Sequence, residues 1–189
     1  MEIKITLAQF VQALVNMSDW HSINDGHNGR VADMAVKIGD KLKLPSDDLF
    51  YLKWGAELHD IGRVGVDDSV LSKKGKLTES QFGAVKSHPE IGYKVIKDTL
   101  PAPICEIVLY HQECFNGTGY PEGLFGEAIP CLARIVKIAD VWDALTNNRP
   151  YRKALTPDHA LHIMNLEKDD FDPQVYAVFL GLLKSGEIR

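Results

Sequence analysis

Residues 51–62 read YLKWGAELHDIG, an apolar stretch that runs into the pair His59-Asp60. A histidine beside an aspartate is ordinary by itself, but comparable residues lie near or inside other apolar helical segments. They are His27, His88, His111 and Asp140. Imidazoles and carboxylates in this number can serve as the ligands of a two-metal site, which activates a water molecule to attack a phosphorus atom. The sequence therefore predicts helices that carry a candidate metal site.

Apolar residues recur at helical spacing through nearly the whole chain, and strand signals are scarce. Candidate caps are Thr6, Ser46 and Thr78, the last with capping-box spacing, and Pro89 should interrupt or bend the helix near His88. The Thr-Pro and Asp-Pro pairs in the C-terminal part predict two further helices. Helices are thus expected at residues 7–15, 27–42, 46–58, 78–85, 104–110 and 132–145, and after Thr156 and Asp172.

Two segments break the helical pattern. Residues 62–76 are rich in Gly, Asp and Lys, and residues 116–130 contain Asn-Gly, Gly-Tyr-Pro and three further turn residues. Both segments are expected to be loops. They follow His59-Asp60 and His111 directly, and loops of this length inside a compact domain are usually functional.

The bulk composition fits one globular domain over residues 1–189. Apolar residues make up 45% and charged residues 25% of the chain, and the net charge of −5 argues against a general DNA- or RNA-binding protein. No apolar run approaches the roughly 20 residues that span a bilayer, and the N-terminus lacks a signal-peptide pattern. Three cysteines without CxxC spacing indicate reduced thiols. We therefore expect a cytoplasmic protein without membrane binding.

Asp140 has the least ordinary setting of the candidate residues. Its neighbours in sequence are apolar, so it should lie near the buried side of its helix, where a cation would relieve the cost of an unpaired carboxylate. The alternative is a bond to Arg30, to Arg134 or to a helix N-terminus. Asp143, one turn later, is expected to be exposed or to support a ligand. Three histidines lack a comparable setting and are interpreted as surface or core residues: His21, His159 and His162.

Five blocks of this sequence, taken together, resemble the HD-GYP family, a branch of the HD-domain metal-dependent phosphohydrolases. The blocks are HNGRVADMA (27–35), AELHDIGRVGVDDSVLSKKGKLT (56–78), HPEIGY (88–93), LYHQECFNGTGYPEGLFGEAIP (109–130) and RIVKIADVWDALTNNRPYRKAL (134–155). The likeness spans about residues 26–180. It implies an all-α fold: an HD-domain helical core with additional C-terminal helices and a long Gly-Tyr-Pro loop, preceded by an N-terminal helix within residues 1–25.

The resemblance also implies roles for individual residues. Six residues match metal ligands: His27, His59, Asp60, His88, His111 and Asp140. Asp60 matches the bridging carboxylate, and Asp60 and Arg63 are the expected catalytic residues. Arg149 and Arg152 match basic residues near the substrate phosphates. Tyr120 belongs to the Gly-Tyr-Pro motif, whose loop borders the site.

The implied activity is hydrolysis of cyclic di-GMP to the linear dinucleotide and, in some members, to GMP. The expected cofactors are two divalent transition metals, Fe or Mn first, with Zn, Ni or Co as alternatives. Two other interpretations stay open: a catalytically impaired module that binds a nucleotide or a partner protein in signalling, and an HD hydrolase for another phosphoester. Candidate partners are the cyclic dinucleotide, a sensor or receiver module and a second copy of the chain.

Four positions depart from the family pattern. Gln112 stands where many members have a second histidine, so one nitrogen ligand is lost. Arg63 replaces a lysine. Arginine keeps the positive charge, but its guanidinium differs in shape from an ammonium group. Asn116 replaces an aspartate before Gly117, and both residues tolerate turn conformations. Three-metal members carry an acidic residue where this chain has Ile23, so two metals are favoured over three.

Overall fold

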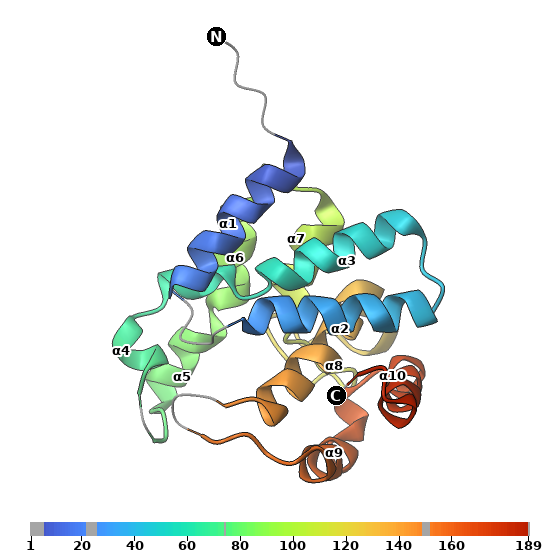
Figure 1. Ribbon diagram of the computed structural model, residues 1–189. Coiled ribbons are helices and arrows are strands. Elements are labelled where there is room, and N and C mark those ends of the chain that lie inside the picture. The colour runs from blue at the N-terminus through green and yellow to red at the C-terminus, as the bar shows by residue number, and fades with distance from the viewer. Residues whose placement is uncertain (1–5, 22–25, 74, 149–151, 189) are drawn as a thin grey trace.

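The computed structural model describes residues 6–21, 26–73, 75–148 and 152–188. Within these ranges the protein is all-α, as expected, with an isolated bridge between Asn116 and Phe125 (Figure 1). The α-helices are α1 (Leu7–His21), α2 (His27–Lys41), α3 (Ser46–Leu58), α4 (Asp68–Leu71), α5 (Glu79–Lys86), α6 (His88–Ile96), α7 (Ala102–Tyr110), α8 (Cys131–Thr146), α9 (Pro157–Leu166) and α10 (Pro173–Ser185). Three short 3-10 helices are η1 (Ile61–Gly65), η2 (Gly126–Ala128) and η3 (Lys168–Asp170).

Most of the predicted capping residues are confirmed by side-chain hydrogen bonds. Thr78 and Gln81 form a reciprocal capping box at α5. The Thr156 side chain caps α9, and Asp172 accepts two backbone N–H groups at the start of α10. The prediction that Ser46 caps a helix was wrong. Ser46 is the first residue of α3, and Pro45 occupies the N-cap position without a side-chain hydrogen bond.

The predicted loop at residues 62–76 was wrong for its first half. This segment begins within η1 and contains α4, whose first turn is capped by Asp67 through the Ser69 backbone N–H at 2.8 Å. Gly62 is required by close packing rather than by a loop, because a Cβ at this position would lie 1.9 Å from the His88 carbonyl oxygen. Pro89 does interrupt the helical run: α5 ends at Lys86 and a separate helix, α6, starts at His88.

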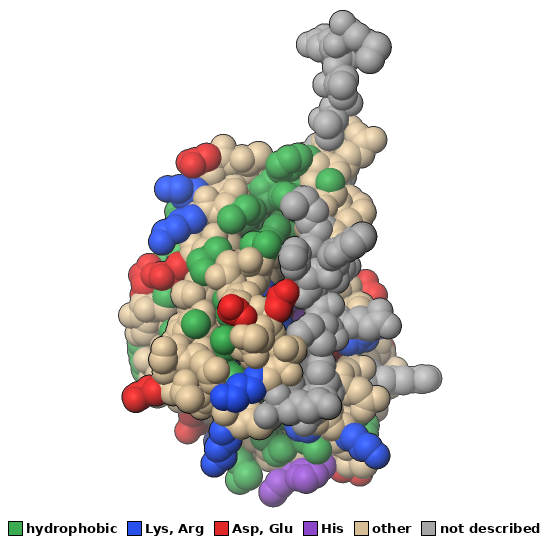
Figure 2. Space-filling model, turned by 90° about the vertical axis from the view of Figure 1, so that its left-hand side faces the viewer, with side chains coloured by type: hydrophobic (Ala, Val, Ile, Leu, Met, Phe, Trp, Pro, Cys, Tyr) green, Lys and Arg blue, Asp and Glu red, His purple; other side chains and the backbone are tan. Residues whose placement is uncertain are grey.

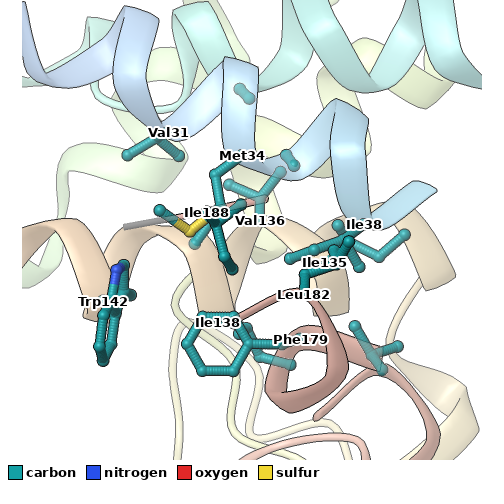
Figure 3. Close-up of a cluster of buried hydrophobic side chains, with 14 of the residues drawn as sticks. Val31, Met34, Ile38, Ile135, Val136, Ile138, Trp142, Phe179, Leu182 and Ile188 are labelled. Carbon is teal, nitrogen blue, oxygen red and sulfur yellow. The ribbon is translucent and has the colours of Figure 1, made fainter. Parts of the chain in front are cut away.

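Two buried hydrophobic clusters form the core. The larger cluster joins α2, α8 and α10 with parts of α3, α7 and α9, and Figure 3 shows Trp142 and Phe179 meeting within it, with ring centroids 5.3 Å apart. The smaller cluster joins α1, η1, α6 and α7 with Leu58 at the end of α3. Close packing links the two, since a Cβ on Gly55 of α3 would lie 2.3 Å from the Ile107 side chain of α7. Among the described helices, none has both the length and the hydropathy needed to cross a bilayer.

Candidate metal centre

The helices bring all six predicted ligands to one buried place. His27 opens α2, His59 and Asp60 follow α3, His88 opens α6, His111 follows α7, and Asp140 lies in the middle of α8. Each of these residues is less than one tenth exposed. Helix ends therefore supply five of the six side chains, and a helix interior supplies the sixth.

Five of the six residues form two groups that share Asp60. His27 and His59 form the first group with Asp60, and His88 and His111 form the second; within each group the potential ligand atoms lie within 4.8 Å of one another. Asp60 Oδ2 lies 3.8 Å from His27 Nε2 and 3.5 Å from His59 Nε2. Asp60 Oδ1 lies 3.4 Å from His88 Nε2. Each carboxylate oxygen thus faces a different group, which is the arrangement of a bridging ligand.

The far ring nitrogens of three histidines fix the direction of their lone pairs. The Nδ1 atoms of His59, His88 and His111 each contact a backbone carbonyl three residues earlier, at 2.6, 2.7 and 3.0 Å. Because a carbonyl can only accept, Nδ1 carries the proton and Nε2 presents its lone pair to the cluster.

These lone pairs give a physical test of whether the residues fit a metal. The Nε2 atoms of His88 and His111 lie 3.1 Å apart, and two lone pairs at this distance repel each other unless a cation lies against them. His59 Nε2 and Asp60 Oδ2 are buried and make no hydrogen bond within the described residues, whereas Asp60 Oδ1 forms an ion pair with Arg63. Buried polar atoms are costly without a partner. The donor set therefore fits divalent cations.

Asp140 and Asp143 complete the first group from α8. Asp140 Oδ1 lies 3.2 Å from His27 Nε2 and 3.9 Å from His59 Nε2, and its Oδ2 accepts a hydrogen bond from Gln112 Nε2 at 3.1 Å. Asp143 Oδ2 lies 2.6 Å from His27 Nδ1, on the other side of that ring. His27 is thus held between two carboxylates of one helix.

The structure bears on the alternatives that the sequence left open for these two aspartates. The alternative partners of Asp140 are engaged elsewhere: Arg30 donates to Asp143 through Nε at 2.6 Å and Nη2 at 3.1 Å, and Arg134 pairs with Asp172. Asp143 is 1% exposed and contacts His27, so of its two alternatives the exposed position was wrong and support of a predicted ligand stays a prediction. A carboxylate one turn after Asp140 was the available sequence signal.

The histidines of the cluster differ in the direction in which their surroundings shift the pKa. Burial alone would lower the pKa of His27, but Asp140 and Asp143 outweigh burial and raise this pKa to about 9. Burial lowers the pKa of His88, and it lowers that of His111 further, with His59 adding to the effect. For Asp60, burial is outweighed by Arg63 and by the nearby histidines, which hold its pKa well below the usual range. The second group is therefore neutral on its histidines and anionic on Asp60 at pH 7.

The remaining predicted residues lie around this cluster. Arg63 Nε is 2.8 Å from Asp60 Oδ1, and its side chain is 28% exposed. The Tyr120 ring meets the His88 ring edge-on, with centroids 6.5 Å apart. Arg152 donates to the backbone carbonyls of Ala144 and Leu145 near the end of α8, so its guanidinium is engaged with the chain itself. Arg149 and Ile23 lie outside the described residues.

Glu113 is a structural residue that the sequence reading missed. Its side chain is 2% exposed and accepts three backbone N–H groups, those of Glu122 at 2.8 Å, Gly123 at 3.0 Å and Leu124 at 3.1 Å. Gly119 lies against the same segment, since a Cβ there would be 2.2 Å from the Cys114 backbone nitrogen. Glu113 thus folds the loop that carries Tyr120 back onto the end of α7. An acidic residue two positions after His111, before a run of turn residues, was the available signal.

The chain is similar to known proteins in sequence and in fold. The HD domain family matches residues 9–175. The chain is 42% identical over 149 residues to the cyclic di-GMP phosphodiesterase response regulator RpfG of Xanthomonas campestris, which covers 77% of this chain and 39% of that protein. It is 38% identical over 155 residues to the 3'3'-cGAMP-specific phosphodiesterase 3 of Vibrio cholerae, with coverage of 80% and 34%. The chain thus spans less than half the length of either curated relative.

A solved structure shows the same fold. Bd1817, an HDG"Y"P protein from Bdellovibrio bacteriovorus, superposes with a TM-score of 0.72 at 22% identity, over 87% of this chain and 53% of that one. The family match covers most of the described helices, and it includes all six residues of the buried cluster. The chain therefore belongs to the HD domain family, in its HD-GYP branch.

Proposed function

We propose that the protein is a metal-dependent phosphodiesterase that opens cyclic di-GMP to the linear dinucleotide. The observation that carries this proposal is the pair of histidine groups that share the two oxygens of Asp60. The names of the curated relatives support it, since they act on cyclic dinucleotides. The phosphodiester bonds of such a molecule are the kind of bond that a two-metal site attacks.

The proposed cofactors are two divalent transition metals, with Fe or Mn favoured by the imidazole and carboxylate donors. His27, His59, Asp60 and Asp140 would hold one ion, and Asp60, His88 and His111 would hold the other. When bound, the metals would supply a hydroxide at neutral pH and neutralise charge on the attacked phosphate. The protein's own part is orientation: backbone carbonyls and Asp143 aim the imidazoles, and Arg63 holds Asp60 ionised.

Substrate contacts are proposed for Tyr120, Arg149 and Arg152. Tyr120 lies at the edge of the second group, where a bound dinucleotide would pass. A guanidinium can clamp two phosphate oxygens at once. Arg152 would have to exchange its carbonyl partners for phosphate, so Arg149 is the stronger proposal of the two.

Arg149→Ala tests the substrate contact. Turnover of cyclic di-GMP should fall by the equivalent of about 2–4 kcal/mol, by analogy with the loss of one donor to a developing oxyanion. Metal content should stay that of the wild type, because Arg149 is not among the donors. Steady-state kinetics with metal analysis of the same preparations checks both. A variant with wild-type turnover would remove Arg149 from the site.

A second candidate function is a module that binds a cyclic dinucleotide and signals without cleaving it. Gln112 favours this alternative, because its amide occupies Asp140 Oδ2 where a second imidazole would supply a metal ligand in many relatives. The substrate could also be 3'3'-cGAMP, since one relative is specific for it.

The deciding experiment is anaerobic purification with metal analysis, followed by incubation with cyclic di-GMP and, separately, with 3'3'-cGAMP. Linear dinucleotide formed from the first compound supports the proposal. Cleavage of the second compound alone would mean that the substrate is 3'3'-cGAMP and not cyclic di-GMP. Binding of either compound without cleavage, under every metal tried, would replace the enzyme with the signalling module.

A further inference from the structure

An exposed lysine lies between two aromatic rings beside the metal cluster. Lys86 Nζ is 4.9 Å from the ring centroid of Phe82 and 5.1 Å from that of Tyr120. Phe82 and Lys86 are one turn apart on α5, so their side chains leave the helix on the same face. Tyr120 comes from the loop after α7. The ammonium is thus placed by two different parts of the chain.

This arrangement lies at the rim of the second histidine group. Tyr120 contacts the His88 ring edge-on, with the centroids 6.5 Å apart. Lys86 is the last residue of α5, and His88 is the first residue of α6, with one residue between them. A ligand that places one phosphate against His88 and His111 would therefore extend toward the Lys86 ammonium.

The exposure of these side chains points to a ligand rather than to core packing. Phe82 is 49% exposed, and α5 has no buried residue, so this helix contributes little to either hydrophobic cluster. Lys86 is exposed and has no carboxylate partner within the described residues. On the face that carries α4 and α5, Lys and Arg side chains are interspersed with exposed hydrophobic and acidic ones (Figure 2).

The chemistry of a cyclic dinucleotide matches this rim. Such a molecule carries two phosphates and two bases, and the metal cluster can engage only the phosphate under attack. The other phosphate needs a cation of its own, because the chain as a whole has a net charge of −5. A base can stack on an exposed aromatic ring whatever its hydrogen-bonding edge, since every base has a π-face.

We propose that Lys86 and Phe82 form a substrate subsite, in which the Lys86 ammonium holds the phosphate that is not cleaved and the Phe82 ring stacks on one base. Tyr120 closes the subsite toward the metals. The proposal rests on the proposed function, because it names further contacts of the same cyclic dinucleotide. Stacking does not read the base edge, so the subsite gives affinity for cyclic dinucleotides without choosing between guanine and adenine.

Kinetics with two substrates test the lysine. Cyclic di-GMP has a second phosphate and bases, whereas bis(p-nitrophenyl) phosphate has one phosphate and no base. In the metal-loaded protein, Lys86→Gln should raise KM for cyclic di-GMP about tenfold, which corresponds to about 1.4 kcal/mol. It should leave kcat and KM for bis(p-nitrophenyl) phosphate and the metal content unchanged, and Lys86→Arg should recover most of the loss.

Lys53 offers a matched control. It is an exposed lysine whose Nζ lies 5.2 Å from the Trp54 ring centroid on α3, so Lys53→Gln removes the same kind of contact away from the subsite. This variant should match the wild type with both substrates. Phe82→Leu should lower kcat/KM for cyclic di-GMP and for 3'3'-cGAMP by the same factor, because stacking is indifferent to the base.

Three results would overturn the subsite. They are an unchanged KM for cyclic di-GMP in Lys86→Gln, an equal loss with both substrates in that variant, and an equal loss in Lys53→Gln. A wild-type protein that hydrolyses bis(p-nitrophenyl) phosphate but neither binds nor cleaves a cyclic dinucleotide would instead overturn the proposed function, and the subsite with it. The two failures are therefore distinguishable.

Discussion

The contact on the far ring nitrogen distinguishes His27 from the other histidines of the cluster. His59, His88 and His111 place Nδ1 against backbone carbonyls, whereas His27 places it against the Asp143 carboxylate. A carbonyl fixes a neutral tautomer, but a carboxylate stabilises a second proton on the ring. The two groups should therefore respond differently to pH when they take up metal.

That difference predicts a pH-dependent affinity for the first group only. Without metal the pKa of His27 is about 9, so at pH 7 its ring holds a proton that a metal must displace. Affinity of the first group should rise about tenfold per pH unit from pH 6 to 8, because one proton is released, and should level off near pH 9. The pKa values of His88 and His111 are lowered, so the second group should change little.

Isothermal titration calorimetry of metal binding, in buffers of different ionisation enthalpy, would measure how many protons are released at each site. One site with a pH slope and one without is the expected result. Equal slopes at both sites, or none at either, would show that the environment of His27 does not set its metal affinity.

Gln112 offers a second prediction for a single residue. Its amide donates to Asp140 Oδ2 at 3.1 Å, so one oxygen of this predicted ligand accepts a hydrogen bond from a neutral side chain. If the missing imidazole weakens one site, Gln112→His should slow the loss of the more weakly held metal to a chelator. Stopped-flow metal release measures this, and two equal sites that the substitution leaves unchanged would refute the idea.

The sequence pointed to the six candidate ligands but not to all the residues that orient them. Histidine and aspartate in unusual apolar settings are visible in a sequence, and all six meet in the structure. Glu113 was missed because its role is to accept backbone N–H groups from residues nine to eleven positions later, a contact that depends on how the loop folds. For Asp143 the sequence left two alternatives open, because helical spacing predicts the side of the helix on which a residue lies but not whether that side is buried.

At the scale of helices, two caps that each precede a proline differ in their tertiary partners. Thr156 and Asp172 both precede a proline that opens a helix. Thr156 only caps α9, whereas Asp172 also pairs with Arg134 of α8. The second cap therefore links α10 to the helix that carries Asp140.

Replacement of the two caps by alanine should separate these contributions. Thr156→Ala should lower the free energy of unfolding by about 1 kcal/mol, the usual value of an N-cap. Asp172→Ala should lower it by about 2–4 kcal/mol, because it also leaves a largely buried guanidinium without its carboxylate. Urea unfolding of both variants measures the difference. Equal losses would mean that the pair with Arg134 contributes nothing.

Helix positions followed from the sequence better than the connections did. Helical periodicity predicted α2, α7 and α8 to within a few residues, because each buries one face. The segment after Asp60 was read as a loop, since its Gly and Asp residues signal turns. In the structure Gly62 is needed for contact with the backbone of α6, and Asp67 caps a helix too short to show a period. Both causes are tertiary or very local, so periodicity cannot reveal them.

At the scale of the whole molecule, the candidate metal centre joins two hydrophobic clusters. α2 and α8 of the larger cluster supply His27 and Asp140, whereas α6 of the smaller cluster supplies His88, and the end of α7 supplies His111. Asp60 lies between them, directly after α3, which contributes to both clusters. The packing of α3 against α7 therefore sets how far apart the two histidine groups lie.

The number of metal ions around Asp60 tests the central claim most directly. Protein purified without oxygen should contain two transition-metal ions per chain by elemental analysis, about 3.5–4 Å apart by X-ray absorption. Asp60→Ala should keep the helical circular dichroism of the wild type and lose tight binding of both ions, because both groups lose a shared ligand. One ion per chain, two ions far apart, or full metal loading of Asp60→Ala would contradict a shared two-metal centre.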